Sequence, residues 1–228
     1  MPDPVFLITG ASTGIGAATA RRAAEAGHRL VLAARSTDKL EALAAELGGD
    51  ERAIAVTCDV TEFDQQEAMV QAALDAFGRI DVVFANAGFG AKRGFLEETP
   101  EQWRAMVLTN VLGCAYTIRA TIPALKDSVG HLLLTSSVAG RRALSGSLYS
   151  ASKHAVTAMA EAARQDLNDT GIRVTSIEPG MTDTPFFDDR PKNALEPDDI
   201  ARAVLYAVGQ PAHVDVNEIL IRPVSQPT

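Results

Sequence analysis

A glycine-rich turn near the N-terminus constrains the fold of this chain more than any other feature. It follows the apolar run Val5–Ile8, which has a β-branched residue at each end, and it reads Gly10-Ala-Ser-Thr-Gly14-Ile-Gly16. The alanine-rich stretch Ala17–Ala26 comes next and is closed by Gly27, a residue type common just after helix ends. A strand, a glycine turn and a helix in this order predict a nucleotide site, because a pyrophosphate can approach the backbone N–H groups at the helix N-terminus.

The spacing of these glycines narrows the interpretation. It is G-x-x-x-G-x-G, where the commoner dinucleotide spacing is G-x-G-x-x-G, and no lysine follows, which excludes an ATP-type phosphate loop. A glycine-rich turn without a ligand is the alternative.

Apolar strands alternate with helices along the rest of the chain, and this alternation predicts an α/β fold. The predicted strands are Val5–Ile8, Arg29–Ala33, Ala53–Thr57, Ile80–Phe84, His131–Thr135, Ile172–Ile177 and Glu218–Ile221. The predicted helices are Ala17–Ala26, Ser36–Leu47, Glu62–Phe77, Pro100–Pro123, Tyr149–Asp169 and Pro197–Val208. We expect a three-layer, doubly wound (Rossmann) fold with a seven-stranded parallel sheet, in which residues 1–228 form a single domain and the polar segment 181–196 is a flap.

Composition argues against several classes of partner. The formal net charge is −8 at pH 7, whereas nucleic-acid binding needs a basic face. Cys58 and Cys114 lie far apart, with no Cys-x-x-Cys or histidine cluster, so we expect neither a disulfide framework nor a metal site. The N-terminus lacks the basic region of a signal peptide, and the longest charge-free stretch, Ala105–Ile118, is too short to span a bilayer. We therefore expect a cytoplasmic protein without nucleic-acid or membrane partners.

Polar and small residues follow directly after several predicted strands. These are the glycine turn, Arg35, Asp59, Asn86-Ala87-Gly88 and Ser136-Ser137. The carboxyl ends of parallel strands meet at one edge of a doubly wound sheet, where ligands bind. We therefore expect these residues to lie around one site.

Arg35 bears on which nucleotide would bind. About 20 residues beyond the glycine turn, an NAD site places an acidic residue for the ribose 2′-hydroxyl, whereas an arginine accommodates the 2′-phosphate of NADP. The sequence has Arg35 at this place and no acidic residue before Asp38. NADP(H) is therefore favoured over NAD(H), with a solvated strand-end charge as the alternative for Arg35.

Tyr149 and Lys153 are four residues apart at the start of a predicted helix, so their side chains share one face. A tyrosine hydroxyl has a pKa near ~10, too high for acid–base catalysis at neutral pH. A cation about 5 Å away, at an effective dielectric constant of ~20, would lower that pKa by about two pH units. The spacing indicates an acid–base pair, and the alternative is a helix-start aromatic beside a solvated lysine.

Asn110 lies in the most apolar part of the predicted Pro100–Pro123 helix. A buried amide needs hydrogen-bond partners, or its burial costs free energy. Asn110 is thus either a satisfied core amide or a residue that holds a water molecule in a relay.

The ordered set of motifs resembles the classical short-chain dehydrogenase/reductase family over essentially the whole chain. The motifs are Thr9-Gly10-x-x-x-Gly14-Ile15-Gly16, Asn86-Ala87-Gly88, Asn110, Ser137, Tyr149-x-x-x-Lys153 and Pro179-Gly180. The resemblance implies an NADP(H)-dependent oxidoreductase that interconverts a carbonyl and a secondary alcohol by hydride transfer. It also implies a cofactor site formed by Gly10, Ser12, Thr13, Gly14, Ile15, Gly16, Arg35, Asp59, Val60, Asn86, Ala87, Gly88, Tyr149, Lys153, Pro179, Gly180, Thr182 and Thr184.

The same resemblance implies four catalytic roles. Tyr149 would donate a proton to the substrate carbonyl, and Ser137 would hold that carbonyl by a hydrogen bond. Lys153 would bind the nicotinamide ribose and lower the pKa of Tyr149, while Asn110 would hold a water molecule.

The sequence departs from the family pattern in three places. Ala85 replaces the first residue of the family's Asn-Asn-Ala-Gly. The interval from Ser137 to Tyr149 is one residue shorter than usual, and Ser136 would restore it; we prefer Ser137 because it directly precedes Val-Ala-Gly, as the catalytic serine commonly does. The segment after Pro179-Gly180 is short, so we expect an open substrate site with loose specificity.

The C-terminal Asn217–Pro223 resembles the branch of NADP-dependent 3-hydroxy acid dehydrogenases and lacks the Gly-Gly of 3-oxoacyl-carrier-protein reductases. This favours a small hydroxy acid or alcohol as the substrate, whose carboxylate could be received by Arg141, Arg142 or Arg190. The expected pocket wall is Phe89, Leu144, Leu148, Met181, Phe186 and Phe187.

The resemblance also implies a homotetramer or homodimer formed through the helices of Asn110 and Tyr149. Three alternatives stay open for the function: a 3-oxoacyl-type reductase, a non-catalytic NADP(H)-binding regulator, and a Rossmann-like methyltransferase.

Overall fold

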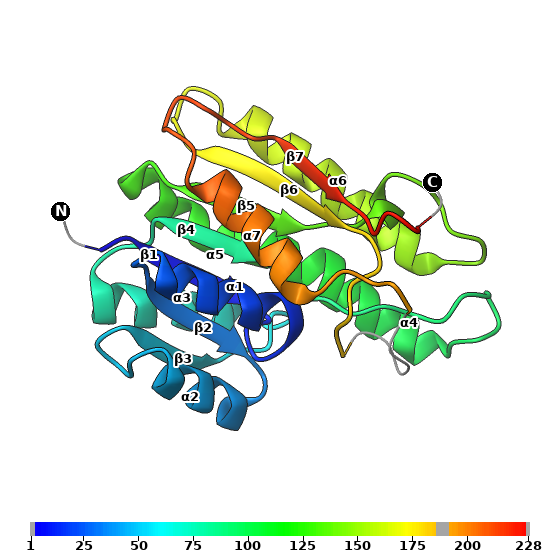
Figure 1. Cartoon of the computed structure of the whole chain (residues 1–228), viewed down its shortest axis with the longest axis horizontal. Coiled ribbons are helices and arrows are strands. Elements are labelled where there is room, and N and C mark those ends of the chain that lie inside the picture. Colours follow the sequence, from blue (N-terminus) through cyan, green and yellow to red (C-terminus); the bar gives the residue numbers. More distant parts are fainter. Residues whose placement is uncertain (1–2, 186–191, 227–228) are drawn as a thin grey trace.

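A seven-stranded parallel sheet forms the centre of the protein (Figure 1). The computed structural model describes residues 3–185 and 192–226. The strand order is β3-β2-β1-β4-β5-β6-β7. In chain order the strands are β1 (Val5–Thr9), β2 (Arg29–Ala34), β3 (Ala53–Thr57), β4 (Val82–Ala85), β5 (His131–Thr135), β6 (Arg173–Pro179) and β7 (Glu218–Ile221). The predicted doubly wound α/β fold is confirmed.

Helices cover both faces of this sheet, so the fold has three layers. The α-helices are α1 (Gly14–Glu25), α2 (Thr37–Glu46), α3 (Phe63–Phe77), α4 (Pro100–Val107), α5 (Cys114–Ser128), α6 (Leu148–Asp166) and α7 (Pro197–Val208). Helices α1, α2 and α7 contribute to the hydrophobic core on one face, and α3, α5 and α6 to the core on the other.

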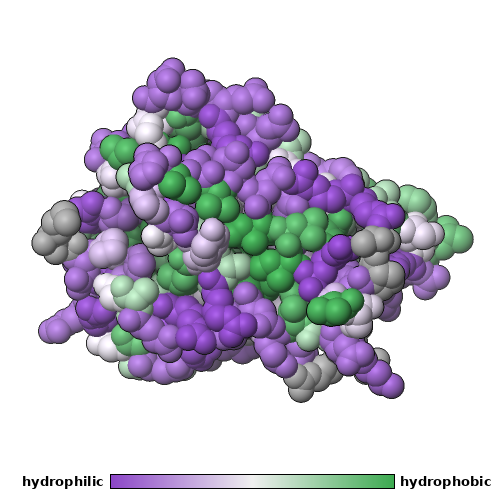
Figure 2. Space-filling model, turned by 45° about the horizontal axis from the view of Figure 1, so that its top comes forward, coloured by the Kyte–Doolittle hydropathy of each residue, from purple (hydrophilic) through white to green (hydrophobic). Residues whose placement is uncertain are grey.

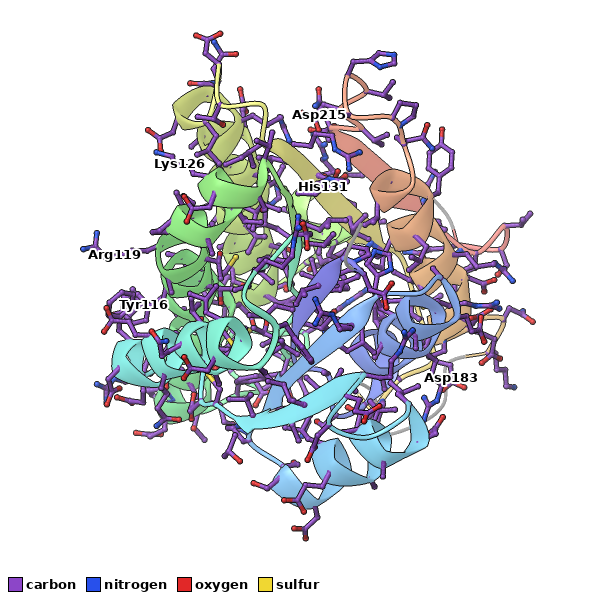
Figure 3. All side chains as sticks on the ribbon, turned by 90° about the vertical axis from the view of Figure 1, so that its left-hand side faces the viewer. Tyr116, Arg119, Lys126, His131, Asp183 and Asp215 are labelled. Atoms are coloured by element: carbon purple, nitrogen blue, oxygen red, sulfur yellow. The ribbon has the colours of Figure 1, made fainter. Side chains whose placement is uncertain are left out.

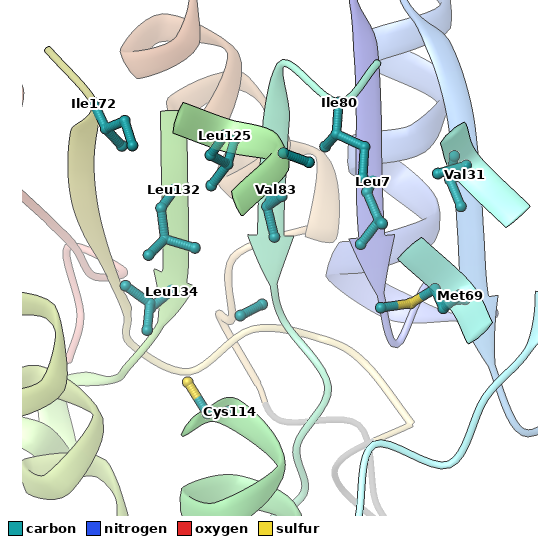
Figure 4. Packing of buried hydrophobic residues seen from close by; sticks show 14 of the residues in the cluster. Leu7, Val31, Met69, Ile80, Val83, Cys114, Leu125, Leu132, Leu134 and Ile172 are labelled. Carbon is teal, nitrogen blue, oxygen red and sulfur yellow. The ribbon is translucent and has the colours of Figure 1, made fainter. Parts of the chain in front are cut away.

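Alternate residues of each strand divide between these two cores. In β1, Leu7 belongs to the core that includes Met69 of α3 (Figure 4), whereas Phe6 and Ile8 belong to the core on the α1 side. Strands buried on both faces are expected to be continuously apolar, which explains why β1 is so easily found in the sequence. Burial of each such side chain stabilises the fold by about 1.5–3 kcal/mol.

The order of the strands reverses between β1 and β4. Strands β2 and β3 lie on one side of this point, and β5, β6 and β7 lie on the other. In doubly wound sheets the crevice at such a reversal, beyond the carboxyl ends of the strands, is where ligands bind.

The helix predicted at Pro100–Pro123 is longer and less regular than expected. It continues through a π-helical turn, Leu108–Gly113, into α5, which contains Pro123 and ends at Ser128. Asn110 lies in this π-helical turn, and such turns occur frequently at functional sites.

By length and composition alone, the whole helical run Pro100–Ser128 is long and apolar enough to cross a membrane, which corrects the expectation drawn from its shorter charge-free part. Of its most apolar window, 33% is buried inside the protein. Its α5 part packs against β4, β5 and α3. On its outer side, Tyr116, Arg119 and Lys126 point away from the sheet (Figure 3).

Candidate active site

A cavity of about 520 Å³ lies at the carboxyl ends of the strands, which is a size typical of small-molecule and cofactor sites. Most residues of the predicted site line it: Gly10, Ser12, Thr13, Gly14, Ile15, Arg35, Asp59, Val60, Asn86, Ala87, Gly88, Ser136, Ser137, Tyr149, Lys153, Pro179, Gly180, Thr182 and Thr184. Of the predicted site residues, Gly16 and Asn110 are buried and do not line this cavity.

The glycine turn is shaped by close approaches of backbone to backbone. A Cβ atom on Gly16 would collide with the carbonyl oxygen of Gly10, and one on Gly10 would lie 2.9 Å from the Cα of Ala87. Helix α1 begins in this turn, its N-cap Thr13 makes no side-chain capping bond, and its first turn contains no acidic residue. Its first N–H groups and the positive end of its dipole are therefore suited to an anion.

Asn86 joins the ends of three neighbouring strands. Its Nδ2 donates a hydrogen bond to the Thr9 carbonyl at 3.1 Å, and its Oδ1 accepts one from Thr135 Oγ1 at 3.1 Å. The edge of the sheet is thus fixed at the point where β1, β4 and β5 meet the cavity.

Tyr149 and Lys153 lie together on the wall of the cavity, as their spacing predicts. Helix α6 begins one residue before Tyr149, where the hydroxyl of Ser147 caps the helix by accepting from the Ser150 N–H at 3.2 Å. The ammonium of Lys153 lies 5.7 Å from the centre of the Tyr149 ring and donates to the Thr135 carbonyl at 2.8 Å. The Ser137 side chain hydrogen-bonds to the Tyr149 phenol.

The predicted lowering of the Tyr149 pKa is wrong for the chain by itself. Burial raises the pKa of Tyr149 to about 12, and the bond to Ser137 offsets only part of this effect. Burial also lowers the pKa of Lys153 to about 8. The prediction considered only the attraction between the two side chains, whereas loss of hydration dominates for both.

The two candidate serines face different neighbours. Ser136 donates its hydroxyl hydrogen to the Lys153 carbonyl at 3.0 Å and lies 2.7 Å from Thr157 Oγ1, so its side chain is engaged with the backbone side of α6. Ser137 Oγ, besides contacting Tyr149, lies 3.3 Å from the Pro179 carbonyl, which accepts from it. The geometry therefore favours Ser137 as the residue beside the phenol.

Asn110 is a fully hydrogen-bonded buried amide. Its Oδ1 accepts from the Phe89 N–H at 3.0 Å, and its Nδ2 donates to the Phe89 carbonyl at 2.9 Å and to Ser152 Oγ at 3.2 Å. A Cβ on Gly88 would lie 3.0 Å from Asn110 Oδ1 and 3.5 Å from Lys153 Nζ. Asn110 thus holds the segment after β4 against α6, close to Lys153.

The arginines predicted to receive a substrate carboxylate need correction. Arg141 Nε donates to Glu178 at 2.7 Å, and its guanidinium also pairs with Glu218, so it is already committed to two carboxylates. Arg142 is exposed and does not line the cavity. Arg190 lies outside the described residues.

The predicted pocket wall is partly correct. Phe89, Leu144 and Met181 line the cavity, whereas Leu148 does not, and Phe186 and Phe187 lie outside the described residues. Several lining residues were not predicted, and two of them, Arg93 and Gln226, have side chains long and polar enough to contact a ligand. Neither belongs to a strand end or to a recognised motif, so no local sequence signal marks them.

Comparison with known proteins adds to this geometry. The family model described as short chain dehydrogenase matches residues 4–194. An uncharacterised oxidoreductase of Staphylococcus saprophyticus is 39% identical, covering 98% of this chain and 99% of its own. An alcohol dehydrogenase of Thermococcus sibiricus, complexed with 5-hydroxy-NADP, has a TM-score of 0.92 at 34% identity and covers 99% of this chain and 98% of its own. Serine dehydrogenase of Escherichia coli has a TM-score of 0.89 at 31% identity, and the match covers 98% of this chain and 100% of the dehydrogenase chain.

Proposed function

The chain belongs to the short-chain dehydrogenase family, and we propose that it is an NADP(H)-dependent oxidoreductase that interconverts a carbonyl and a secondary alcohol. Family membership makes it an enzyme that acts on CH–OH groups. The observation that carries the proposal is that Tyr149, Lys153 and Ser137 share one cavity with the glycine turn.

The residues of the cavity suit a dinucleotide phosphate. The open N-terminus of α1 would hold the pyrophosphate, and Lys153 the nicotinamide ribose. Arg35 is exposed at the cavity wall, and no carboxylate of residues 3–185 or 192–226 forms an ion pair with it, so it is available for the 2′-phosphate. The 5-hydroxy-NADP ligand of the Thermococcus enzyme supports this choice.

In carbonyl reduction the bound cofactor would supply the hydride. The raised pKa of Tyr149, about 12, keeps its phenol protonated at neutral pH, and the phenol can therefore give its proton to the carbonyl oxygen. The Ser137 hydroxyl, next to the phenol, would hold that oxygen. As Tyr149 loses its proton, the nearby Lys153 ammonium stabilises the phenolate, because opposite charges attract strongly in a buried site.

The substrate that we propose is a small hydroxy acid or alcohol. Arg93 lines the cavity, and the N–H of the next residue, Gly94, donates to the Gly146 carbonyl at 2.8 Å, three residues before Tyr149. No carboxylate of the described residues forms an ion pair with Arg93. Arg93 is therefore suited to bind a substrate carboxylate near the phenol.

A test of the proposed function mixes the protein with NADPH and a panel of neutral ketones, 2- and 3-oxo acids and a 3-oxoacyl thioester. We expect loss of NADPH absorbance with at least one member. Tyr149→Phe keeps the ring and removes only the hydroxyl, and should lower turnover about 10²–10⁴-fold while NADPH binding persists. Near wild-type turnover in Tyr149→Phe would show that this phenol is not the acid. Binding of NADPH with no turnover would instead support a regulator, and no binding would favour a methyltransferase.

We also propose a cytoplasmic homotetramer or homodimer. Apolar side chains are exposed on and just before α4, with Phe95 62%, Leu96 97% and Val107 39% exposed. Hydrophobic residues also form a band across one otherwise mostly hydrophilic face (Figure 2). Surfaces of this kind are commonly covered by another subunit.

A further inference from the structure

The C-terminal segment that follows β7 returns to the cavity. The Gly180 N–H donates to the Ile221 carbonyl at 2.6 Å, and the Gln226 N–H donates to the Pro223 carbonyl at 3.0 Å in a turn. Gln226 thereby reaches the cavity wall, although it lies only two residues from the end of the chain. The last turn of the chain is therefore part of the site.

Gly180 allows this close approach. A Cβ atom at Gly180 would collide with Oε1 of Gln226 and would lie 3.1 Å from the Cα of Arg222. The missing side chain of Gly180 thus faces the C-terminal segment. Because Gly180 has no side chain, the backbone just after β6 can pack directly against the C-terminal segment, and the two together form part of the cavity wall.

The amide of Gln226 can have only one orientation in this place. Its Oε1 accepts a hydrogen bond from the Met181 N–H at 2.9 Å. Because a backbone N–H can only donate, the oxygen must face Met181, and the NH₂ group must point away from it. That NH₂ group has no protein partner among residues 3–185 and 192–226 and is not buried, so both of its hydrogens are available.

We propose that Gln226 is a specificity residue with two separable functions. Its amide oxygen fixes the Met181 backbone, and its NH₂ group donates a hydrogen bond to an acceptor oxygen of the substrate. The second function rests on the proposed oxidoreductase activity, whereas the first does not. The site would accordingly prefer substrates that carry an oxygen beyond the reacting carbonyl, such as a hydroxyl, an ester or a carboxylate.

Two substitutions separate these functions. Gln226→Glu keeps an acceptor oxygen for Met181 and removes the donor, whereas Gln226→Leu removes both. Ser225→Ala, at the exposed neighbouring position, is the matched control. The substrates are a neutral keto ester and the same ketone without its ester group, because an ester oxygen can accept a hydrogen bond from Gln226 but cannot donate one to the glutamate.

The first measurement is hydrogen exchange of the Met181 amide, which needs neither cofactor nor substrate. Loss of a single hydrogen bond should speed its exchange about tenfold in Gln226→Leu and leave it unchanged in Gln226→Glu and Ser225→Ala. Unchanged exchange in Gln226→Leu would overturn the positioning function, whether or not the protein is active.

The second measurement is steady-state kinetics. Both Gln226 variants should raise KM for the keto ester about tenfold and leave KM for the plain ketone and the Kd of NADPH within about twofold. An equal rise for both ketones, or a change confined to NADPH binding, would overturn the substrate contact. If none of the carbonyl compounds makes the wild-type protein oxidise NADPH, the proposed function fails, and the substrate contact fails with it. The exchange measurement still decides whether Gln226 positions Met181.

Discussion

Replacing Lys153 with methionine should make the protein more stable and also inactive. The Lys153 side chain is 4% exposed, and burial lowers its pKa from 10.5 to about 8. A lowered pKa means that the folded protein holds the ammonium less favourably than water does. Methionine has a similar length, no charge and a flexible chain that fits irregular core space.

The size of the effect follows from the pKa. The change from 10.5 to about 8 corresponds to about 3 kcal/mol of destabilisation at pH 7, at about 1.36 kcal/mol per pH unit. The hydrogen bond from Lys153 to the Thr135 carbonyl is lost in the variant, which removes roughly 1 kcal/mol. Lys153→Met should therefore raise the free energy of unfolding by about 2 kcal/mol, or Tm by roughly 4–8 °C.

The gain in stability of Lys153→Met over the wild-type protein should decrease as the pH rises. Below pH 8, Lys153 is charged in both the folded and the unfolded chain, and the full cost of the buried ammonium is present. Between about pH 8 and 10.5, the folded chain loses this proton before the unfolded chain does, so the wild-type protein becomes relatively more stable. The advantage of Lys153→Met should therefore shrink over this range.

Urea unfolding of both proteins at pH 7 and at pH 10 measures this difference, provided that their m-values agree. Lys126→Met is the control, because Lys126 points outward from α5 (Figure 3) and should change stability by no more than about 0.5 kcal/mol. A variant less stable than wild type at pH 7, or a gain that does not vary with pH, would refute the argument that the buried charge is costly.

Three further substitutions test the assignment of single residues. Arg35→Asp should shift the preference for NADPH over NADH at least about tenfold toward NADH, and an unchanged ratio would exclude the 2′-phosphate contact. Ser137→Ala should lower kcat about 10²-fold or more, whereas Ser136→Ala should keep turnover and cost about 1 kcal/mol of stability; the reverse result would exchange the two serines. Arg93→Met should raise KM for an oxo acid about tenfold and leave a neutral ketone unaffected, and an equal effect on both would exclude a carboxylate contact.

The fold could be predicted from the sequence because its signals are local. Continuous apolar strands and the glycine turn specify the doubly wound sheet without any long-range information. The predicted ends of strands were wrong where the end depends on contacts with residues distant in the sequence. The fourth strand was expected from Ile80 but begins at Val82, because Asp81 is used in a link to β1, where its carboxylate accepts from the Val5 N–H at 2.8 Å.

Site residues that directly follow a strand could be predicted from the sequence. Side chains whose role depends on contacts with residues far away in the sequence could not. Arg141 seemed free in the sequence, but Glu178 and Glu218 reach it from β6 and β7. Gln226 reaches the cavity only because the chain turns back after β7. The pKa of Tyr149 was mispredicted for a related reason, because burial is a property of the whole fold and cannot be read from the Tyr149–Lys153 spacing.

The charge of the cavity differs in sign from that of the whole protein. Among the described residues that line it, Arg35, Arg93 and Lys153 are basic and only Asp59 is acidic, whereas the chain has a net charge of −8. At physiological ionic strength, charges further apart than about 8 Å are largely screened in solvent, but charges along a low-dielectric cavity are screened much less. The local basic groups therefore dominate the field inside the cavity. An acidic protein can thus attract an anionic cofactor, because the residues that line a cleft decide the sign of the field inside it.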